Sequence, residues 1–387
     1  MNFTEIKQLE DEFQLATYKK MDIAVTRGSG AWVWTGDGEK YLDLYGGHAV
    51  CATGHSHPHV VEAIKNQAEQ MLFYSNLVYS EIRAKTAEKL VSVAPKSLTK
   101  AFFCNSGTEA NENAMRIARL ATGREKVVTF TRGFHGRTAD SISATFLGKY
   151  REIGLPNVPF HECAEFGDLN SVTATADKDT AAIMIEPIQS MAGVREAPPA
   201  FFSGLREICD DLGIVLIFDE VQTGIGRTGS WFFAGSEAAD GVEPDIISLA
   251  KSLGSGVPVG ACLVNEKVAA HIKENDLGTT FGGGMLAMAA VRATLEAIEL
   301  DDMIANASAI EQHLRDSLSG FPGITAIRGK GCLVGIKFDD ACGQVHKKLL
   351  EKKIITGTSS EPCVLRLLPP LMVGLDQIDM LVEALSS

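Results

Sequence analysis

Short apolar runs alternate with amphipathic stretches along most of the chain. Runs of this length and polarity are typical of strands buried on both faces of a sheet. They lie at residues 100–105, 125–130, 181–187, 213–220, 244–251 and 260–265. Helical patterns lie between several of them, as at 199–213. Strand–helix alternation of this kind predicts an α/β fold with a mostly parallel central sheet.

The two ends of the chain have a different pattern. Residues 1–46 predict a helix followed by a hairpin around the turn "TGDGE". The pattern of the last hundred or so residues predicts a long helical stretch over 285–320 and then short strands, which indicates a second, smaller α+β domain. We therefore predict an N-terminal segment, 1–46, that joins the small domain, a large domain over 47–284 and a C-terminal small domain over 285–387, since chain ends often pack together.

Composition narrows the classes of protein to consider. The 387 residues carry a net charge of −13, which argues against nucleic-acid binding. No apolar run approaches a membrane span, and the polar, acidic start is unlike a signal peptide. The eight cysteines form no CxxC pair, so we expect reduced thiols and a cytoplasmic protein.

One apolar run ends in two acids. Ile214–Phe218 is uninterrupted by polar residues, and Asp219 and Glu220 follow it directly. Ligands of open α/β sheets bind beyond the carboxyl ends of the strands, so these acids stand where a site is expected. A buried carboxylate is costly unless a cation accompanies it.

Lys251 closes another apolar run, 32 positions after Asp219. A buried lysine loses its proton more easily and becomes an amine nucleophile. The alternative is a lysine whose stem packs on apolar surface while its ammonium reaches water.

Two loops after strand candidates carry further polar groups. In "FFCNSGTEAN", Ser106, Gly107 and Thr108 lie where a strand turns into a helix, a place suited to a phosphate. A simple helix cap explains the same residues. In "FHGRT", Phe134 could stack on a planar ring and Arg137 could grip a carboxylate, although a surface arginine is the plainer interpretation.

Together these groups match the needs of pyridoxal 5′-phosphate. The cofactor requires a phosphate cradle, a stacking aromatic, a lysine for its Schiff base and an acid that keeps the ring nitrogen protonated. The alternating histidines of "GHSHPH" (55–59) could in principle bind a metal, but no acid or cysteine cluster near them completes a site, and we expect none.

The motifs, taken in order, resemble those of class III, fold-type I aminotransferases, closest to the acetylornithine and succinylornithine branch. They include "FFCNSGTEANENAMRIAR", "FHGRT", "FDEVQTGIGRTG", "PDIISLAKSLGSGVPVGA", "GTTFGG" and "LRLLPPL", and they span nearly the whole chain. The resemblance implies a homodimer with shared active sites and transfer of an amino group from an acylated ornithine to 2-oxoglutarate, as in arginine biosynthesis.

The resemblance also implies roles for single residues. Lys251 would form the Schiff base and Asp219 would pair with the ring nitrogen. The other implied cofactor contacts are Ser106, Gly107 and Thr108 at the phosphate, Phe134 and Val221 on the two ring faces, His135, Gln222 at the phenolic oxygen, and Thr280 at the phosphate of the neighbouring subunit. The implied substrate-binding residues are Arg137, Arg366, Glu186, Trp32 and His48, of which Glu186 could also be a structural acid at the sheet end.

The sequence departs from the family at Met191, where "EPIQSMAGV" lacks a second glutamate. In ornithine-type relatives that glutamate neutralises the arginine matching Arg366 while the donor is bound. Without it we expect the charge of Arg366 to stay free in both half-reactions. Trp32 and His48 also differ from the residues usual at the substrate entrance, although packing explains Trp32 equally well. The alternatives are a transaminase of another ω-amino acid or amine, a pyridoxal-phosphate aminomutase and, less in keeping with the motifs, a non-catalytic cofactor binder.

Overall fold

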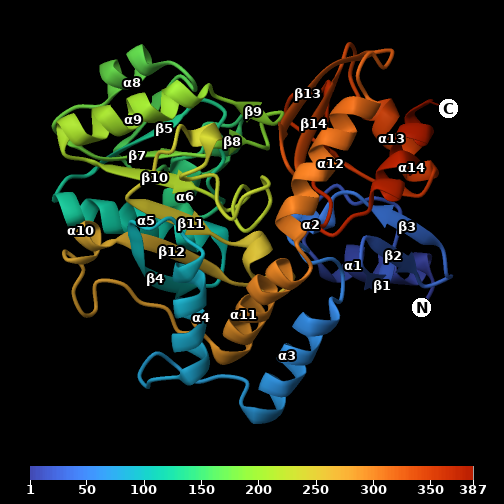
Figure 1. Ribbon diagram of the computed structural model, residues 1–387, viewed down its shortest axis with the longest axis horizontal. Helices are drawn as coiled ribbons and strands as arrows, with labels where there is room; N and C mark the ends of the chain where they lie inside the picture. Colours follow the sequence, from blue (N-terminus) through green and yellow to red (C-terminus); the bar gives the residue numbers. More distant parts are fainter. Residues whose placement is uncertain (387) are drawn as a thin grey trace.

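A seven-stranded sheet forms the centre of the larger part of the molecule, seen in a computed structural model that describes residues 1–386 (Figure 1). Its strand order is β4-β12-β11-β10-β7-β5-β6, and neighbours from β11 to β6 are parallel, whereas β12 is antiparallel to both its neighbours. The strands are β4 (Leu98–Cys104), β5 (Lys126–Phe130), β6 (His161–Ala164), β7 (Thr180–Ile185), β10 (Val215–Asp219), β11 (Ile246–Leu249) and β12 (Gly260–Asn265). The prediction of an α/β fold with a mostly parallel central sheet is confirmed.

All six apolar runs that predict strands form strands of this sheet. The sequence prediction missed β6, because the stretch "HECA" has two polar residues followed by only two apolar ones and so lacks a long apolar run. The strand lies at the sheet edge and pairs with β5 alone, so only part of it is buried.

Helices cover both faces of the central sheet. Helix α5 (Gly107–Thr122) packs on one face and α9 (Pro199–Leu212) on the other. Side chains alternate along a strand, so Val215 and Ile217 of β10 join the core cluster with α5, while Leu216 and Phe218 join the cluster with α9. This alternation decides the directions of Asp219 and Glu220 at the end of β10.

The two chain ends form smaller sheets. The N-terminal sheet has the order β1-β2-β3-β15, and β2 and β3 form the hairpin predicted around "TGDGE". Its strands are β1 (Val25–Ser29), β2 (Trp32–Thr35), β3 (Lys40–Asp43) and β15 (Ile354–Ile355). The antiparallel C-terminal sheet consists of β13 (Ile324–Lys330), β14 (Leu333–Phe338), β17 (Val364–Leu367) and β16 (Gly357–Thr358). Pairing of β15 with β3 links both ends of the chain; the three domain ranges themselves remain a prediction.

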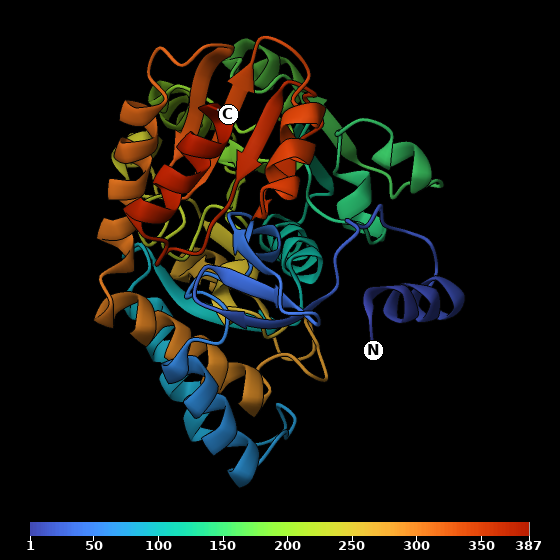
Figure 2. The same ribbon diagram turned by 90° about the vertical axis from the view of Figure 1, so that its right-hand side faces the viewer.

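The remaining elements connect these sheets. The hairpin of β8 (Ile188–Gln189) and β9 (Arg195–Glu196) follows β7. The predicted helical stretch 285–320 is two helices, α11 (Met285–Leu300) and α12 (Met303–Ser317). The other helices are α1 (Phe3–Phe13), α2 (Gly46–Ala49), α3 (Pro58–Gln70), α4 (Glu81–Ser92), α6 (Ala139–Ser143), α7 (Tyr150–Ile153), α8 (Leu169–Thr175), α10 (Glu266–Ala269), α13 (Gly343–Glu351) and α14 (Leu375–Ser386), with short 3-10 turns η1 (Glu237–Ala239) and η2 (Lys251–Gly254). Helix α1 buries none of its residues and stands apart from the body (Figure 2).

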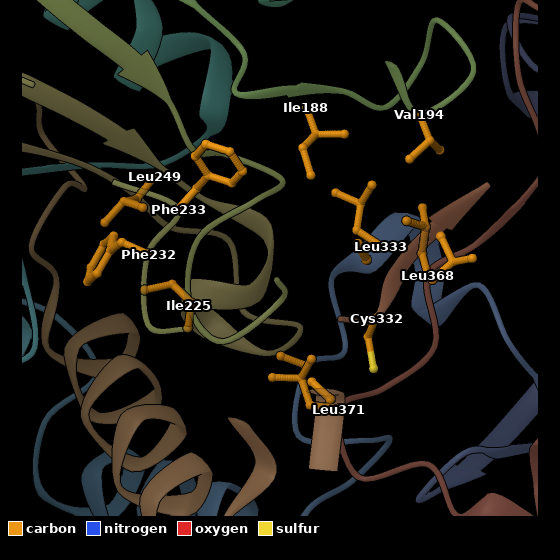
Figure 3. Close-up of a cluster of buried hydrophobic side chains, with 14 of the residues drawn as sticks. Ile188, Val194, Ile225, Phe232, Phe233, Leu249, Cys332, Leu333, Leu368 and Leu371 are labelled. Carbon is orange, nitrogen blue, oxygen red and sulfur yellow. The ribbon is translucent and has the colours of Figure 1, made fainter. Parts of the chain in front are cut away.

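An apolar cluster joins the large part to the C-terminal part (Figure 3). Ile188 and Val194 come from the β8–β9 hairpin, while Leu333 and Leu368 come from the C-terminal part. All four side chains are almost completely buried. The hairpin is therefore held between the two parts. Among the described residues, no helix is long and apolar enough to cross a bilayer.

Candidate active site

Asp219 ends β10 with its side chain on the α5 face of the sheet. It follows Val215 and Ile217 at intervals of two residues, and both of these pack with α5. Asn111 lies on the buried face of α5, where its Nδ2 donates to Asp219 Oδ2 at 2.7 Å. Ser248 of β11 donates to Asn111 Oδ1 at 2.5 Å. The carboxylate is thus buried but hydrogen-bonded, as a buried charge must be.

Two more donors reach Asp219. His135 Nδ1 lies 2.8 Å from Oδ2, and the backbone N–H of Val221 donates to Oδ1 at 3.1 Å. Burial alone would lower the pKa of His135, but the hydrogen bond and the charge of Asp219 outweigh it and raise the pKa. Because His135 is fully enclosed, this pairing fixes the orientation of its ring beside Asp219.

Glu220 has a different role from Asp219, although the two acids are adjacent. Its side chain follows the alternation of Phe218 to the opposite face, where it accepts from the backbone N–H groups of Phe233 at 2.7 Å and Ala234 at 2.9 Å. The Thr223 hydroxyl donates to the same carboxylate. Glu220 therefore anchors the loop that follows β10, and only Asp219 belongs to the site.

Lys251 follows β11 and begins η2 with a positive φ of 40°. This backbone conformation is uncommon for a lysine, and it turns the chain sharply after β11. Burial lowers the pKa of the Lys251 ammonium. The charges of Asp219 and Glu186 oppose this shift, whereas those of Arg366 and Arg227 add to it. A lysine that releases its proton more readily is the nucleophile that the sequence predicts.

Glu186 lies beyond β7 on the same face of the sheet as Asp219. Its Oε1 accepts from the backbone N–H of Phe134 at 2.7 Å. Burial raises its pKa to about 7, with the charge of Asp219 adding to the effect and that of His135 opposing it. Glu186 therefore holds the loop that carries Phe134, the structural role that the sequence left open; its contact with substrate remains a prediction.

The strand-to-helix turn before α5 forms a narrow cradle. Ser106 is the N-cap, and its Oγ accepts from the Glu109 N–H at 3.3 Å, so the capping role considered from sequence is present. A Cβ on Gly107 would come within 2.8 Å of Val221 Cγ1, so only glycine allows this approach. The Thr108 hydroxyl lies 2.7 Å from that of Thr138. The first N–H groups of α5 and these hydroxyls suit a phosphate.

Phe134 and Arg137 are joined by a residue that the sequence prediction missed. The rings of Phe134 and Tyr150 meet edge-on with centroids 5.6 Å apart, and the Arg137 guanidinium carbon lies 4.3 Å from the Tyr150 ring centre. Arg137 is otherwise exposed. Tyr150 thus orients the arginine that the sequence proposes as a carboxylate ligand.

Arg366 lies in β17, is almost completely buried, and has three neutral partners. It donates to the Tyr45 hydroxyl at 2.6 Å, the Ser190 hydroxyl at 3.2 Å and the Thr358 carbonyl at 2.7 Å. Within residues 1–386 no carboxylate is ion-paired with it, in keeping with the missing glutamate at Met191. The sequence anticipated a free charge but not the neutral acceptors that hold it.

The remaining predicted residues are distributed around this centre. Gln222 is buried just after Val221, and His48 contacts the Tyr45 ring at 4.8 Å, which places it beside Arg366. Trp32 instead lies under Lys40, whose Nζ is 3.7 Å from the ring centre, and packs against the core. Thr280 is exposed in a surface loop. The structure therefore brings neither Trp32 nor Thr280 into contact with the other residues of the site within one described chain.

The three histidines of "GHSHPH" contact three different acids. His55 pairs with Asp43 at 2.8 Å, His57 with Asp301 at 3.0 Å and His59 with Glu296 at 2.9 Å. Their partners come from β3 and from α11 and its end, so the rings diverge. Across residues 1–386 no group of histidine, cysteine and acid side chains could hold a metal ion.

Some residues of the site had a weak signal in the sequence. Asn111 is a polar residue among the alanines and methionine that α5 buries, which is unusual on an apolar helix face. Tyr45, Tyr150 and Ser190 have no such signal, because only the fold brings them to Arg366 and Arg137.

The donor set fits a flat, phosphorylated, cationic ring. The ring would lie between Phe134 and Val221, its positive nitrogen beside Asp219, its phosphate at Ser106, Gly107 and Thr108, and its reactive carbon toward Lys251. Each of these groups has the charge and hydrogen-bonding capacity that pyridoxal phosphate requires.

Comparison with known proteins agrees with this chemistry. The aminotransferase class-III family matches residues 14–387. The acetylornithine aminotransferases of Methanopyrus kandleri and Methanocaldococcus jannaschii are 41% and 40% identical to the chain; each match covers 97% of this chain and 96% of the relative. The ornithine aminotransferase of Toxoplasma gondii has a similar structure, with a TM-score of 0.92 at 26% identity, covering 100% of this chain and 95% of that one. These matches confirm the resemblance, including the fold-type I architecture.

Proposed function

Because the chain belongs to the class III aminotransferases, a family that uses pyridoxal phosphate, we propose that it transfers the terminal amino group of N-acetylornithine, or of a similar acylated ornithine, to 2-oxoglutarate. The products are the corresponding semialdehyde and glutamate, a step of arginine biosynthesis. The full-length relatives at about 40% identity named above support this choice of donor.

The chain's own residues account for the proton movements of this reaction. When bound, pyridoxal phosphate supplies an electron sink that stabilises negative charge at the substrate carbon. The Lys251 amine takes the proton from the carbon that bears the nitrogen and returns it on the other side of the transfer. Asp219, held by Asn111 and His135, keeps a proton on the ring nitrogen. Arg366 and Arg137 bind carboxylates of the substrates.

The Asp219 network is the observation that carries the proposal. A buried acid that is hydrogen-bonded to Asn111, His135 and the Val221 N–H is pre-organised to face a cation. The lysine with a lowered pKa follows the adjacent strand. The direct test is formation of glutamate from 2-oxoglutarate by the purified protein with N-acetylornithine as donor. Absence of glutamate with every amine donor would contradict the proposal.

Arg366 bears on which donor is used. Its partners Tyr45, Ser190 and Thr358 leave its charge uncompensated, so a donor that carries its own negative group gains an ion pair there. This observation keeps the second candidate function open, which is a transaminase of another ω-amino acid or amine, or an aminomutase. Glutamate formation separates the transaminases from an aminomutase.

We expect Met191→Glu to shift donor preference by about ten-fold, because a carboxylate one residue from Ser190 neutralises Arg366. The ratio of kcat/KM for unacylated ornithine to that for N-acetylornithine should rise. Met191→Gln, of similar size and without charge, is the control and should leave the ratio unchanged. An unchanged ratio in the glutamate variant removes Met191 as a determinant of donor choice.

We also propose that two copies of the chain form a dimer with shared active sites. An exposed apolar surface lies beside Thr280, and rings of Phe73 and Phe281 meet there with centroids 5.2 Å apart. Its other large apolar members are Met71, Leu72, Tyr74, Leu77, Val78 and Tyr79. Contiguous exposed apolar surface of this kind supports a protein partner, and Thr280 would then reach the phosphate site of the second copy.

All eight cysteines are free thiols, which supports a reducing, cytoplasmic location.

Shared sites predict complementation between two inactive variants. Lys251→Ala lacks the amine, and Thr280→Glu places a carboxylate against the partner's phosphate, so each variant alone should be inactive or nearly so. After random one-to-one pairing, half of the dimers are mixed and each has one intact site, so about a quarter of wild-type activity should return. No recovery in a mixture shown to contain mixed dimers would contradict the role of Thr280 across the interface.

A further inference from the structure

Three arginines line a cavity that none of the active-site residues contacts. The cavity has a volume of about 420 Å³ and is lined by Arg132, Arg195, Arg328, Glu196 and Glu361. Arg132 follows β5, Arg195 lies in β9 and Arg328 in β13. Strands β9 and β13 contact each other where the large part meets the C-terminal part (Figure 1). Three segments far apart in sequence thus place arginine side chains around one cavity.

The two acids of this cavity are already engaged. Glu361 forms an ion pair with Arg328, with Nη1 to Oε2 at 2.8 Å, and Lys337 lies 3.7 Å from its other oxygen. Glu196 accepts from the backbone N–H of Gly329 at 2.6 Å. Neither acid is within ion-pair distance of Arg132 or Arg195 among the described residues.

Arg132 and Arg195 therefore have no acid in direct ion-pair contact, although the charges of Glu361 and Glu165 act on Arg195 from a greater distance. Within residues 1–386 neither guanidinium has a hydrogen-bonded or ion-paired partner. Arg195 is partly buried, and burial together with the charges of Arg132 and Arg328 lowers its pKa, against the opposing charges of Glu361 and Glu165. Like charges gathered in a hollow repel each other, and an anion with several acceptor oxygens relieves that repulsion while it accepts from the guanidinium forks.

We propose that this cavity binds a small dianion, with Arg132 and Arg195 as the primary ligands and Arg328 as a third cation fixed by Glu361. The volume suits a molecule with two carboxylates or one phosphate group. Dicarboxylates and phosphates both present paired oxygens to guanidinium groups, and measurements of their binding distinguish the two classes of ligand. Such a ligand joins the β5 loop, the β8–β9 hairpin and β13.

The site lies next to segments that matter for catalysis. Arg132 precedes Phe134 by two residues, and the hairpin that carries Arg195 also carries Ser190, a partner of Arg366. Gly193 in the same hairpin accepts from Arg328 at 3.0 Å. A bound dianion thus restrains the loops that hold both Phe134 and the Arg366 acceptor.

Isothermal titration calorimetry of the holoenzyme at low salt, with inorganic phosphate and separately with succinate, tests the site. The holoenzyme is used because its cofactor fills the phosphate cradle at α5. At least one of the two ligands should bind, and Arg132→Ala and Arg195→Ala should each weaken that binding by about ten-fold. Arg116→Ala, which removes an exposed arginine of α5 with no described partner, should leave it unchanged. The ligand whose binding is weakened in the arginine variants, phosphate or succinate, shows whether the site takes a phosphate group or a dicarboxylate.

A purely structural role for these arginines gives a different result. If Arg132 and Arg195 only support the fold, removal of one should lower the melting temperature without ligand, and neither phosphate nor succinate should raise the melting temperature of the wild type. If they bind the dianion, removal of one should leave the melting temperature without ligand unchanged or higher, and the ligand should raise the melting temperature of the wild type alone. Should Arg195→Ala fail to fold, the exposed Arg132 provides the deciding variant. Binding of neither ligand to the wild type, or affinities for both ligands that are unchanged in the variants, overturns the proposal. Succinate bound at Arg366 is recognised because it is insensitive to both substitutions. The measurement reads binding rather than amino transfer, so its failure is distinct from failure of the proposed function.

Discussion

Lys251→Ala is expected to lower kcat by at least about 10⁴-fold while the protein stays folded. Under the proposed function, the substitution removes both the amine that would bind the cofactor covalently and the base that would move the substrate proton. A buried ammonium is costly, so its loss should leave stability equal or higher. The measurements are kcat, the melting temperature and the visible absorption of the bound cofactor.

The matched control for this variant is Lys267→Ala, which removes an exposed lysine of α10. Its activity should equal that of the wild type. Small amines added to the Lys251 variant should restore part of the rate, because they supply a base at the vacated position. Wild-type turnover by Lys251→Ala would remove the lysine from the mechanism.

Asp219→Asn is expected to lower kcat by about 10²-fold or more and to weaken cofactor binding. The amide keeps the shape of the carboxylate but cannot hold a proton on the ring nitrogen by its charge. It also leaves a donor facing His135 Nδ1 or Asn111 Nδ2, which costs about 1–3 kcal/mol of stability. Steady-state kinetics and titration of the apoenzyme with pyridoxal phosphate measure the two effects.

Glu220→Gln is the informative control for Asp219, because the two acids are neighbours on opposite faces. Its amide nitrogen would face the N–H of Phe233 or Ala234, so the melting temperature should fall. Cofactor affinity and kcat of the folded fraction should stay close to wild type. Equal loss of cofactor binding in both variants would contradict the distinct role assigned to Asp219.

The sequence was sufficient to predict most of the central sheet and the position of the candidate site at the carboxyl ends of its strands. Strands buried on both faces read as continuous apolar runs, and the acids and lysine after them are conspicuous because burial makes such groups costly. The same reasoning fails for β6, an edge strand in which Glu162 is exposed and Cys163 is only partly buried. It also cannot separate Asp219 from Glu220 until the alternation along β10 is related to the helices on each face.

Residues that complete the site from distant segments were beyond sequence reasoning. Tyr45 and Ser190 reach Arg366 only because the N-terminal segment, the β8–β9 hairpin and β17 converge. The spacing of these residues in the sequence does not predict their contacts with Arg366. For Trp32 the sequence left packing and substrate binding open, and its ring lies under Lys40 and packs against the core, while a contact with substrate stays a prediction.

The most direct test of the central claim is a half-reaction followed by absorbance. The purified holoenzyme is mixed with N-acetylornithine in the absence of acceptor, and in parallel with N-succinylornithine, ornithine, 4-aminobutyrate and glutamate. The account predicts rapid bleaching of the yellow cofactor by an acylated ornithine and recovery of the colour when 2-oxoglutarate is added. Bleaching by glutamate or an unacylated amine alone would contradict the acylornithine assignment, and a protein that binds pyridoxal phosphate without any yellow form would contradict the role of Lys251 itself.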